Sequence, residues 1–385
     1  MSRPLRVMIS AGEASGDRLG AGLAAALRDQ DPSIDLIGMG GPQMRDAGVR
    51  LVQDSSEVSV VGISEVLSRL PQIRRAMVRL EQTLDEERPT LLVPVDFPDF
   101  NLRLAARAVR RDVGVVYFVS PQVWAWRQSR VRRIRRLVRE MLVLFDFERE
   151  FYRDAGVPVT WVGHPLAEAP PPAPAPADLR EGIGLEPDSA VVALLPGSRS
   201  GEIERHMPVL LNVAERLRRR RPELEFLVPL APSAPERMLR GLIRDSGLER
   251  VRVHAGDFPD LLCVCAAGVV ASGTASLDAA TVGLPMVVIY RMNPMSYWIG
   301  KRMIRVDHVA MPNLIAGTRV VPELLQDECN PARIAAEIER YFDDPGHAER
   351  VRSALRSVRE KLGEPGVYRR AAERVRANLD PVESG

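Results

Sequence analysis

A short apolar run followed by glycine, serine and arginine is the first feature with chemical potential in this sequence. Val191–Leu195 has the length of a strand, and Pro196-Gly197-Ser198-Arg199 follows it before a helical pattern. The free N–H groups at a helix start and the planar guanidinium of Arg199 both suit phosphate. The loop therefore indicates an anion site, although an ordinary strand–helix connection with a solvated arginine would look the same.

A second turn of small residues favours the phosphate interpretation. Ser272-Gly273-Thr274 follows the apolar run Gly268–Ala271 and leads into a helical pattern. Asp278 falls one turn into that pattern, where its carboxylate could reach sugar hydroxyls or simply interact with the helix dipole. Arg291-Met292-Asn293 follows the next apolar run, so the second half of the chain offers several phosphate-binding groups.

The first half of the chain instead carries carboxylates after its apolar runs. They are Glu13 and Asp17, in a loop with Gly12 and Gly16, and Asp96 and Asp99 in DFPDFN. Open α/β sheets bind ligands at the carboxyl ends of their strands. This division suits a cleft in which one domain holds a phosphorylated donor and the other activates a hydroxyl acceptor.

Alternating strand and helix patterns position these loops. Strands are expected at Leu5–Ser10, Ile34–Gly38, Thr90–Val95, Val113–Val119, Met141–Leu144, Val191–Leu195, Glu225–Leu230, Val251–Ala255, Gly268–Ala271 and Pro285–Tyr290. Such alternation predicts an α/β fold with doubly wound parallel sheets. Ala169–Ala177, with five prolines in nine residues, interrupts it. We expect a first domain at 1–168, a linker at 169–178, a second domain at 179–343 and a helical tail at 344–385 that packs across a domain or against another subunit.

Composition and missing motifs exclude several classes of protein. The chain has 385 residues, 45% hydrophobic and 27% charged, which fits a two-domain globular protein. Three cysteines without a CxxC pair fit a reducing cytoplasm, and no signal peptide or spanning run of about 20 apolar residues is visible. GxGxxG, P-loop, HExxH and GxSxG patterns are absent, and the DxD at Asp29–Asp31 lies in a polar turn. We therefore expect no cofactor and no metal.

Two arginine-rich segments could contact an anionic surface. Glu65–Leu80 combines helical apolar spacing with arginines, around a proline at Pro71. Arg127–Arg139 holds seven arginines and no acidic residue. The alternatives are an ordinary helix covering a sheet and a solvated helix face, because the only lysines are Lys301 and Lys361 and arginine is abundant throughout.

Several longer strings resemble one family. SAGEASGD, DFPDFN, SPQVWAW, LPGSR with a following EI, ASGTASLD, YRMNP, MPNLIAG and ELLQDE occur in the order and approximate spacing of bacterial lipid-A-disaccharide synthases, from about Val7 to Tyr341. SPQVWAWR and MPNLIAG are long and uncommon, so chance is a poor explanation. The resemblance implies a GT-B glycosyltransferase with two Rossmann-like domains facing a cleft.

The resemblance also implies a reaction and a location. The family joins UDP-2,3-diacylglucosamine to 2,3-diacylglucosamine 1-phosphate through a β-1,6 linkage, releases UDP, and works at the cytoplasmic face of the inner membrane. Because both substrates are acylated, we expect Val60–Leu80 to be the apolar entry face and Arg127–Arg139 its electrostatic partner. A homodimer that shares the helical tail is expected on the same basis, and nucleic acid is not expected as a partner.

The matching motifs assign roles by resemblance. Asp96 would be the general base and Asp99 its orienting neighbour, although the sequence does not distinguish which of the two titrates as the base. Arg199 would bind the leaving diphosphate, and Asp278 the ribose, where the family usually has glutamate. The remaining expected ligand-binding residues are Gly12, Glu13, Gly16 and Asp17 on the acceptor side and Gly197, Ser198, Ser272, Gly273, Thr274, Arg291, Asn313 and Gln326 on the donor side.

Two other functions fit some of the same features. Another GT-B enzyme that uses a UDP-sugar, such as a non-lipid glycosyltransferase or an epimerase, would share the phosphate loops. A non-catalytic binder of phosphorylated or nucleic-acid ligands would use the arginines of Arg127–Arg139. Turnover of an unacylated UDP-sugar would favour the first. Full loss of activity in Asp96→Asn with UDP affinity retained would argue against the second.

Overall fold

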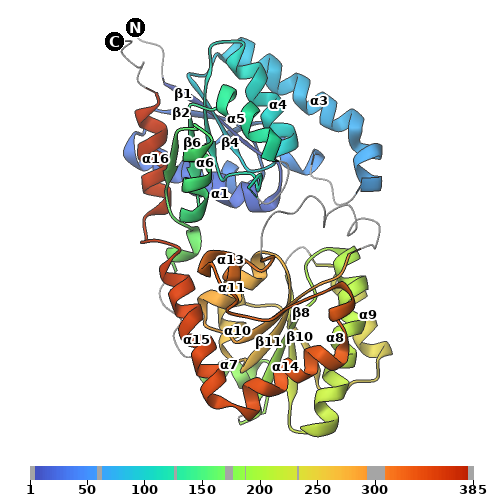
Figure 1. The fold of residues 1–385 in the computed structure, drawn as a ribbon. Coiled ribbons are helices and arrows are strands. Elements are labelled where there is room, and N and C mark those ends of the chain that lie inside the picture. The colour runs from blue at the N-terminus through green and yellow to red at the C-terminus, as the bar shows by residue number, and fades with distance from the viewer. Residues whose placement is uncertain are drawn as a thin grey trace. The chain divides into compact units, whose positions relative to one another are not determined.

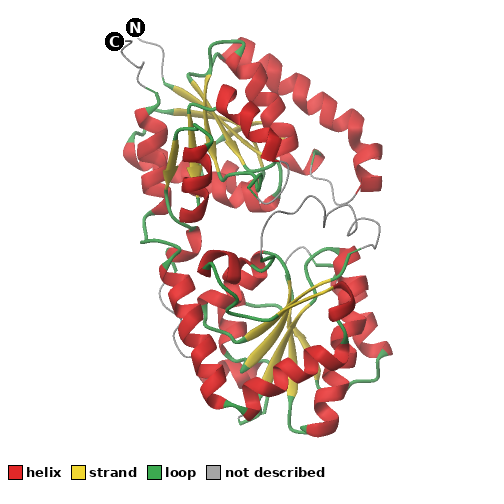
Figure 2. Ribbon diagram, in the orientation of Figure 1, coloured by secondary structure: helices red, strands yellow, loops and turns green. Residues whose placement is uncertain are grey.

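The described part of the chain forms two compact units. The computed structural model describes residues 5–58, 63–124, 128–169, 177–186, 188–231, 234–292 and 308–379, with the backbone alone at 63–69, 128 and 177. One unit is Met1–Glu168 with Leu362–Gly385, and the other is Ala169–Lys361. Each contains one parallel sheet flanked by helices (Figures 1 and 2).

The first unit is built on a seven-stranded parallel sheet in the order β3-β2-β1-β4-β5-β6-β7. Its strands are β1 (Arg6–Ala11), β2 (Asp35–Gly40), β3 (Arg50–Asp54), β4 (Leu91–Val95), β5 (Gly114–Phe118), β6 (Glu140–Val143) and β7 (Val159–Trp161). In the register, Val7 of β1 lies between Leu36 of β2 and Leu91 of β4. The strand order reverses between β1 and β4, and this switch point is where open α/β sheets bind ligands.

Helices cover both faces of this sheet. They are α1 (Ala14–Gln30), α2 (Pro42–Asp46), α3 (Ile63–Glu87), α4 (Pro98–Val109), α5 (Val131–Leu137), α6 (Asp146–Asp154) and α16 (Val367–Ala377). Alternate strand residues enter different cores, because successive side chains point to opposite faces. Val115 and Tyr117 pack in the cluster with α3 and α4, whereas Val116 and Phe118 pack in the cluster with α1 and α16. The strands therefore appear in the sequence as continuous apolar runs.

The carboxy-terminal helix α16 belongs to the first unit, where it packs beside α1 (Figure 1). The buried carboxylate of Glu140 accepts hydrogen bonds from Arg374 (2.8 and 3.0 Å), Asn378 (2.7 Å) and Thr160 (2.6 Å). At the other end of the helix, Glu168 accepts hydrogen bonds from the N–H groups of Gly366 and Val367. These contacts attach α16 to the first unit through residues that are 198 to 238 positions apart in the sequence.

The second unit contains a six-stranded parallel sheet in the order β10-β9-β8-β11-β12-β13. Its strands are β8 (Val191–Leu195), β9 (Glu225–Pro229), β10 (Val251–His254), β11 (Ala267–Ala271), β12 (Met286–Tyr290) and β13 (Glu323–Leu325). Its helices are α7 (Ala177–Gly182), α8 (Ser200–Arg220), α9 (Glu236–Asp245), α10 (Phe258–Cys263), α11 (Thr274–Thr281), α13 (Met311–Ala316), α14 (Pro331–Asp343) and α15 (Pro345–Glu360). Here the order reverses between β8 and β11.

The expected fold class of two doubly wound α/β domains is confirmed, and the strands predicted from apolar runs are all present. Apolar runs did not reveal β3, β7 and β13, which are only partly buried, and β7 and β13 have three residues each. The segment expected as one helical tail is divided instead, because α15 packs in the second unit and α16 in the first. Most of the proline-rich linker, at 170–176, lies outside the described residues.

Candidate active site

Asp96 lies at the switch point of the first unit, directly after β4. Its φ angle is +45° and that of Phe97 is +50°, so two consecutive residues other than glycine adopt the left-handed region. Such a conformation is unfavourable and needs support from its surroundings. The support comes from the Asp96 carbonyl, which accepts hydrogen bonds from Asn101 Nδ2 (2.8 Å) and from the Tyr117 hydroxyl (2.7 Å).

Asn101 ties together the ends of the two central strands. Its side chain is fully buried, and its Nδ2 also donates to the carbonyl of Ser10 at 3.0 Å, while its Oδ1 accepts a hydrogen bond from Ser10 Oγ at 2.7 Å. The amide thus fixes the end of β1 against the turn that carries Asp96. The sequence analysis quoted Asn101 within DFPDFN but gave it no role.

The carboxyl group of Asp96 has an unusual environment. Burial, together with the nearby negative charge of Glu13, raises its pKa from 3.8 to about 6, against a hydrogen bond from the Phe97 backbone that lowers it. Glu13 stands at the start of α1, at the end of the neighbouring strand β1. A carboxyl group that titrates close to neutral pH is suited to general-base chemistry.

Asp99 has a different environment from Asp96. It lies in the first turn of α4, where its side chain is 69% exposed and forms an ion pair with Arg130. The two aspartates of DFPDFN are therefore chemically distinct, one at the switch point and the other at the surface.

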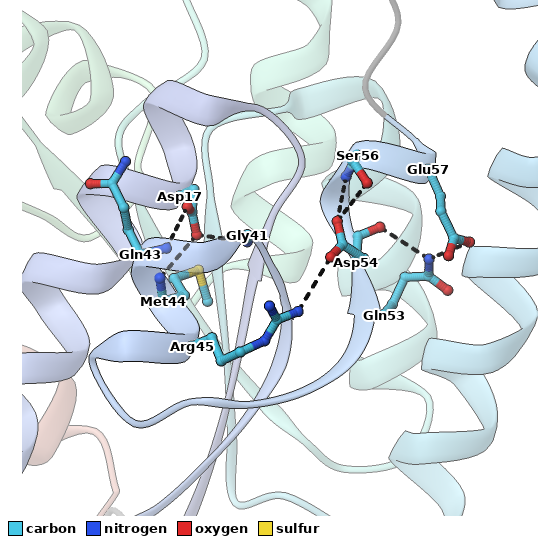
Figure 3. A network of polar contacts seen from close by, with 9 residues as sticks. All are labelled: Asp17, Gly41, Gln43, Met44, Arg45, Gln53, Asp54, Ser56 and Glu57. Carbon is cyan, nitrogen blue, oxygen red and sulfur yellow. Dashed lines mark hydrogen bonds and ion pairs between the residues drawn. The ribbon is translucent and has the colours of Figure 1, made fainter.

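Asp17 is a structural residue rather than a ligand-facing one. The residue is only 2% exposed, and its carboxylate accepts hydrogen bonds from the N–H groups of Gly41 (2.6 Å), Gln43 (3.0 Å) and Met44 (3.1 Å) at the start of α2 (Figure 3). A carboxylate stabilises a helix N-terminus in this way. Because its oxygens are engaged inside the protein, the structure gives no support to the expectation that Asp17 lines the acceptor cleft, which stays a prediction.

The two loop glycines differ in importance. A Cβ atom at Gly12 would lie 2.2 Å from the ring of Phe97, so glycine lets the loop after β1 approach the Asp96 turn closely. A Cβ atom at Gly16 would make only ordinary contact, at 3.4 Å from Ala11. Gly12 therefore shapes the switch point through packing.

The loop after β8 forms the switch point of the second unit together with the loop after β11. Gly197 has φ +105°, and Arg199 is exposed immediately before α8. Glu202, in the first turn of α8, accepts hydrogen bonds at its Oε2 from the N–H groups of Ser198 (3.2 Å) and Arg199 (3.4 Å). The backbone donor of Ser198 that the sequence analysis assigned to phosphate is thus occupied by an internal carboxylate.

The loop after β11 presents small groups at the start of α11. Gly273 has φ +158° with open space around its Cα, and Thr274 is the first helical residue. Ser272 Oγ donates to the carbonyl of Val309 at 3.4 Å. Asp278 lies one turn further along, where its carbonyl accepts a hydrogen bond from Thr281. An anion could approach the open N-terminus of this helix closely.

Asn313 is committed to the fold rather than to a ligand. It is fully buried, its Nδ2 donates to Val321 O (2.9 Å) and Glu323 Oε1 (2.7 Å), and its Oδ1 accepts from the N–H groups of Val320 (2.8 Å) and Val321 (2.9 Å). These four bonds use the full capacity of an amide side chain. These contacts give no support to the expectation that Asn313 contacts the donor, which stays a prediction. Glu323, which the sequence analysis missed, is its partner.

Arg291 and Gln326 meet at the ends of the adjacent strands β12 and β13. Arg291 Nε donates to the carbonyl of Gln326 at 3.4 Å, and Gln326 has φ +50°. Both side chains are half-buried. Asn293, the third residue of the Arg291 loop, lies outside the described residues.

Metal ligands and membrane spans are not evident in the described ranges. No group of three or more histidine, cysteine, aspartate or glutamate side chains there could hold a metal ion. No described helix is long and apolar enough to cross a bilayer.

Two parallel-sheet α/β units with polar loops at their switch points define a glycosyltransferase fold of the GT-B class. The chain resembles the UDP-GlcNAc 2-epimerase from Neisseria meningitidis in its structure bound to UDP-GlcNAc, with a TM-score of 0.64 at 13% identity, covering 97% of this chain and 100% of that one. A calicheamicin glycosyltransferase gives a TM-score of 0.60 at 17% identity, covering 99% and 100%.

Sequence similarity identifies the family. The model of the lipid-A-disaccharide synthetase family matches residues 7–376. The lipid-A-disaccharide synthase of Geobacter sulfurreducens is 49% identical over 367 residues, 95% of each chain, and that of Myxococcus xanthus is 44% identical over 381 residues, 99% of each chain. The chain belongs to the lipid-A-disaccharide synthase family of glycosyltransferases, which confirms the resemblance found in the sequence.

Proposed function

We propose that this enzyme transfers the sugar of UDP-2,3-diacylglucosamine to the 6-hydroxyl of 2,3-diacylglucosamine 1-phosphate, with inversion at the anomeric carbon. The products are the β-1,6 disaccharide 1-phosphate and UDP. Membership of the lipid-A-disaccharide synthase family supports the reaction class. A structural relative that binds UDP-GlcNAc within the same fold supports a UDP-sugar donor.

The observation that carries the mechanism is the partly buried Asp96 carboxylate, with its raised pKa, at the switch point of the first unit. As the acceptor 6-oxygen forms a bond to the anomeric carbon, Asp96 takes the hydroxyl proton. The bond between the anomeric carbon and the diphosphate oxygen breaks, and UDP leaves with the electron pair. Because the pKa of Asp96 is raised to about 6, the group is ionised at neutral pH yet basic enough to accept the proton. A positioned base contributes roughly 10²–10⁴-fold to the rate.

The donor is assigned to the second unit. Arg199, the open N-terminus of α11 at Gly273 and Thr274, and Ser272 supply positive charge and donors for the diphosphate. Glu202 would have to release the N–H groups of Ser198 and Arg199 before these could bind the donor. Asp278, Arg291 and Gln326 are assigned to the nucleoside side. In this arrangement no metal is required, so turnover should persist in excess EDTA.

Mass spectrometry of the reaction with both acylated substrates tests the proposal. The expected product is the acylated disaccharide 1-phosphate, formed together with one UDP for each disaccharide. Consumption of soluble UDP-N-acetylglucosamine at a comparable rate, with no need for the acylated acceptor, would instead indicate a different GT-B enzyme.

We also propose peripheral binding to an anionic membrane through the exposed face of α3. Leu70 and Val78 are 50% and 47% exposed, two turns apart, and line a surface groove with arginines. The groove residues are Leu70, Pro71, Arg74, Arg75, Val78, Arg79 and Gln82. Buried Met77 and Leu80 and partly buried Ile73 face the core instead. Val60–Gly62 and Arg127 lie outside the described residues, as does the side chain of Leu67.

Vesicle sedimentation tests the membrane proposal. Replacing Leu70 and Val78 together by glutamine should reduce binding to vesicles containing anionic lipid. Val109→Gln, at an exposed apolar residue on α4, is the matched control and should leave binding unchanged. Equal vesicle binding by wild type, the Leu70 and Val78 double variant and Val109→Gln would refute the proposal that this face of α3 binds the membrane. We also propose that the enzyme binds at the cytoplasmic face of the membrane and that it forms a homodimer. Sedimentation velocity of the purified protein tests the homodimer, and a monomer would refute it.

A further inference from the structure

His206 is a fully buried side chain that connects two loops of the second unit. It lies on α8, two turns after the loop that carries Arg199. Its Nδ1 lies 2.8 Å from the carbonyl oxygen of Pro196, at the end of β8. Its Nε2 lies 3.0 Å from the backbone nitrogen of Arg291, directly after β12.

The two partners fix the protonation state of the ring. The carbonyl of Pro196 can only accept a hydrogen bond and the N–H of Arg291 can only donate one. Nδ1 therefore carries the proton and Nε2 accepts, so His206 is the neutral Nδ1–H form. A second proton, on Nε2, would point at the Arg291 N–H and break that contact.

The position of these contacts in the sheet gives them significance. Strands β8 and β12 are not neighbours, since β11 lies between them. The ring of His206 thus bridges the loops on either side of the Ser272–Thr274 loop, which follows β11. Backbone pairing connects β8 and β12 only indirectly, through β11. The side chain of His206 therefore adds a direct constraint on the distance between the loop after β8 and the loop after β12.

We propose that His206 is a positioning residue for the UDP part of the donor. It sets the spacing between the Pro196–Arg199 loop, assigned to the diphosphate, and Arg291, assigned to the nucleoside. It touches no substrate atom in this role and acts through the two backbone groups that it holds. The inference rests on the assignment of the donor to this unit under the proposed function. It adds a residue to which the sequence alone gave no role.

Acidification should weaken the bridge. Burial lowers the pKa of His206, Arg205 on the same helix acts in the same direction, and Glu202 together with the contacts to Pro196 and Arg291 opposes them. Tyr290 of β12 also packs near the ring, with centroids 5.9 Å apart. The neutral ring is therefore maintained at and above neutral pH and is lost only in acid.

Three substitutions separate the two contacts. His206→Asn places an amide donor near the Nδ1 position and can keep the Pro196 bond, whereas His206→Gln places a carbonyl oxygen near the Nε2 position and can keep the Arg291 bond. His206→Leu removes both. Tyr341→Phe is the matched control, because the Tyr341 hydroxyl is buried and donates to Met286 O (2.9 Å) at the opposite end of β12.

The experiment measures the dissociation constant of UDP by calorimetry at pH 8, with the melting temperature of each full-length variant. We expect the Leu variant to weaken UDP binding by about tenfold or more and the Asn and Gln variants by a smaller factor, as expected for losing one or two buried hydrogen bonds. Tyr341→Phe should lower the melting temperature with UDP affinity within about twofold of wild type.

The outcomes are distinguishable. If the histidine variants melt lower but bind UDP as tightly as wild type, His206 is merely structural and the inference is overturned. If wild-type protein itself does not bind UDP, the donor assignment fails instead. Comparison of wild type with His206→Gln across acidic pH adds a further readout, because protonation of UDP affects both proteins equally. Only wild type should lose additional affinity as His206 becomes charged.

Discussion

Replacing Asp96 by asparagine should stabilise the first unit at neutral pH while removing activity. The carboxyl group has a pKa of about 6 in the folded protein, against an ordinary value of 3.8. The folded state therefore binds the proton more tightly than the unfolded chain does, and ionising Asp96 destabilises the fold. This penalty grows as the pH rises from 3.8 to 6 and is complete above that range.

The magnitude follows from the two pKa values. The full penalty is about 3 kcal/mol at pH 8, and roughly half of it remains at pH 5. The asparagine amide cannot ionise, so the D96N variant should gain up to these amounts over wild type. Any other interaction lost at the site would lower the stability of D96N by the same amount at both pH values. The change in the stability difference between pH 5 and pH 8, about 1–2 kcal/mol, therefore tests the burial of the charge more directly.

Urea unfolding followed by tryptophan fluorescence is a suitable assay, because Trp124 and Trp161 both lie in the first unit. Asp99→Asn is the matched control. That aspartate is exposed and paired with Arg130, so its loss should destabilise by at most about 1 kcal/mol. A stability difference between D96N and wild type that does not depend on pH would refute the reasoning about burial.

Further predictions concern the groups around Asp96 and the anchoring of α16. Glu13→Gln removes a charge that raises the pKa of Asp96, so the acidic limb of the kcat/KM profile should move to lower pH, by on the order of one unit or less. An unmoved limb would contradict this coupling. Asn101→Ala removes the hydrogen bonds that hold the Asp96 turn, so it should lower kcat more than it raises KM and lower the free energy of unfolding by about 1–3 kcal/mol. Steady-state kinetics and urea unfolding measure these effects. Equal changes in kcat and KM would contradict the prediction. Glu140→Ala leaves Arg374 without its partner, so amide hydrogen exchange should become faster in α16 but not in α15. Unchanged exchange in α16 would show that Glu140 does not hold this helix in place.

Apolar periodicity was sufficient to predict the fold class, because strands buried on both faces appear as continuous apolar runs. The same rule explains the missed strands. Val159–Trp161 and Glu323–Leu325 are three-residue edge strands that bury little surface, so they leave no such run.

The positions of candidate site residues at the ends of strands could be predicted from the sequence, whereas the contacts of polar residues with distant partners could not. Asp96 could be located because it follows a buried strand directly. Asp17 and Asn313 have the same polar character, but their oxygens bind backbone N–H groups of Gly41 and Val320, contacts that only the folded chain reveals. The role of His206 depends in the same way on Arg291, 85 residues away.

The central claim is that Asp96 is the base for glycosyl transfer to the acylated acceptor. The most direct test measures single-turnover formation of the disaccharide 1-phosphate by Asp96→Asn and Asp99→Asn, with the UDP dissociation constant of each. The account predicts a loss of roughly 10²-fold or more for D96N with unchanged UDP affinity, and a much smaller effect for D99N. Near-wild-type turnover by D96N, or a loss explained by weakened UDP binding, would contradict it.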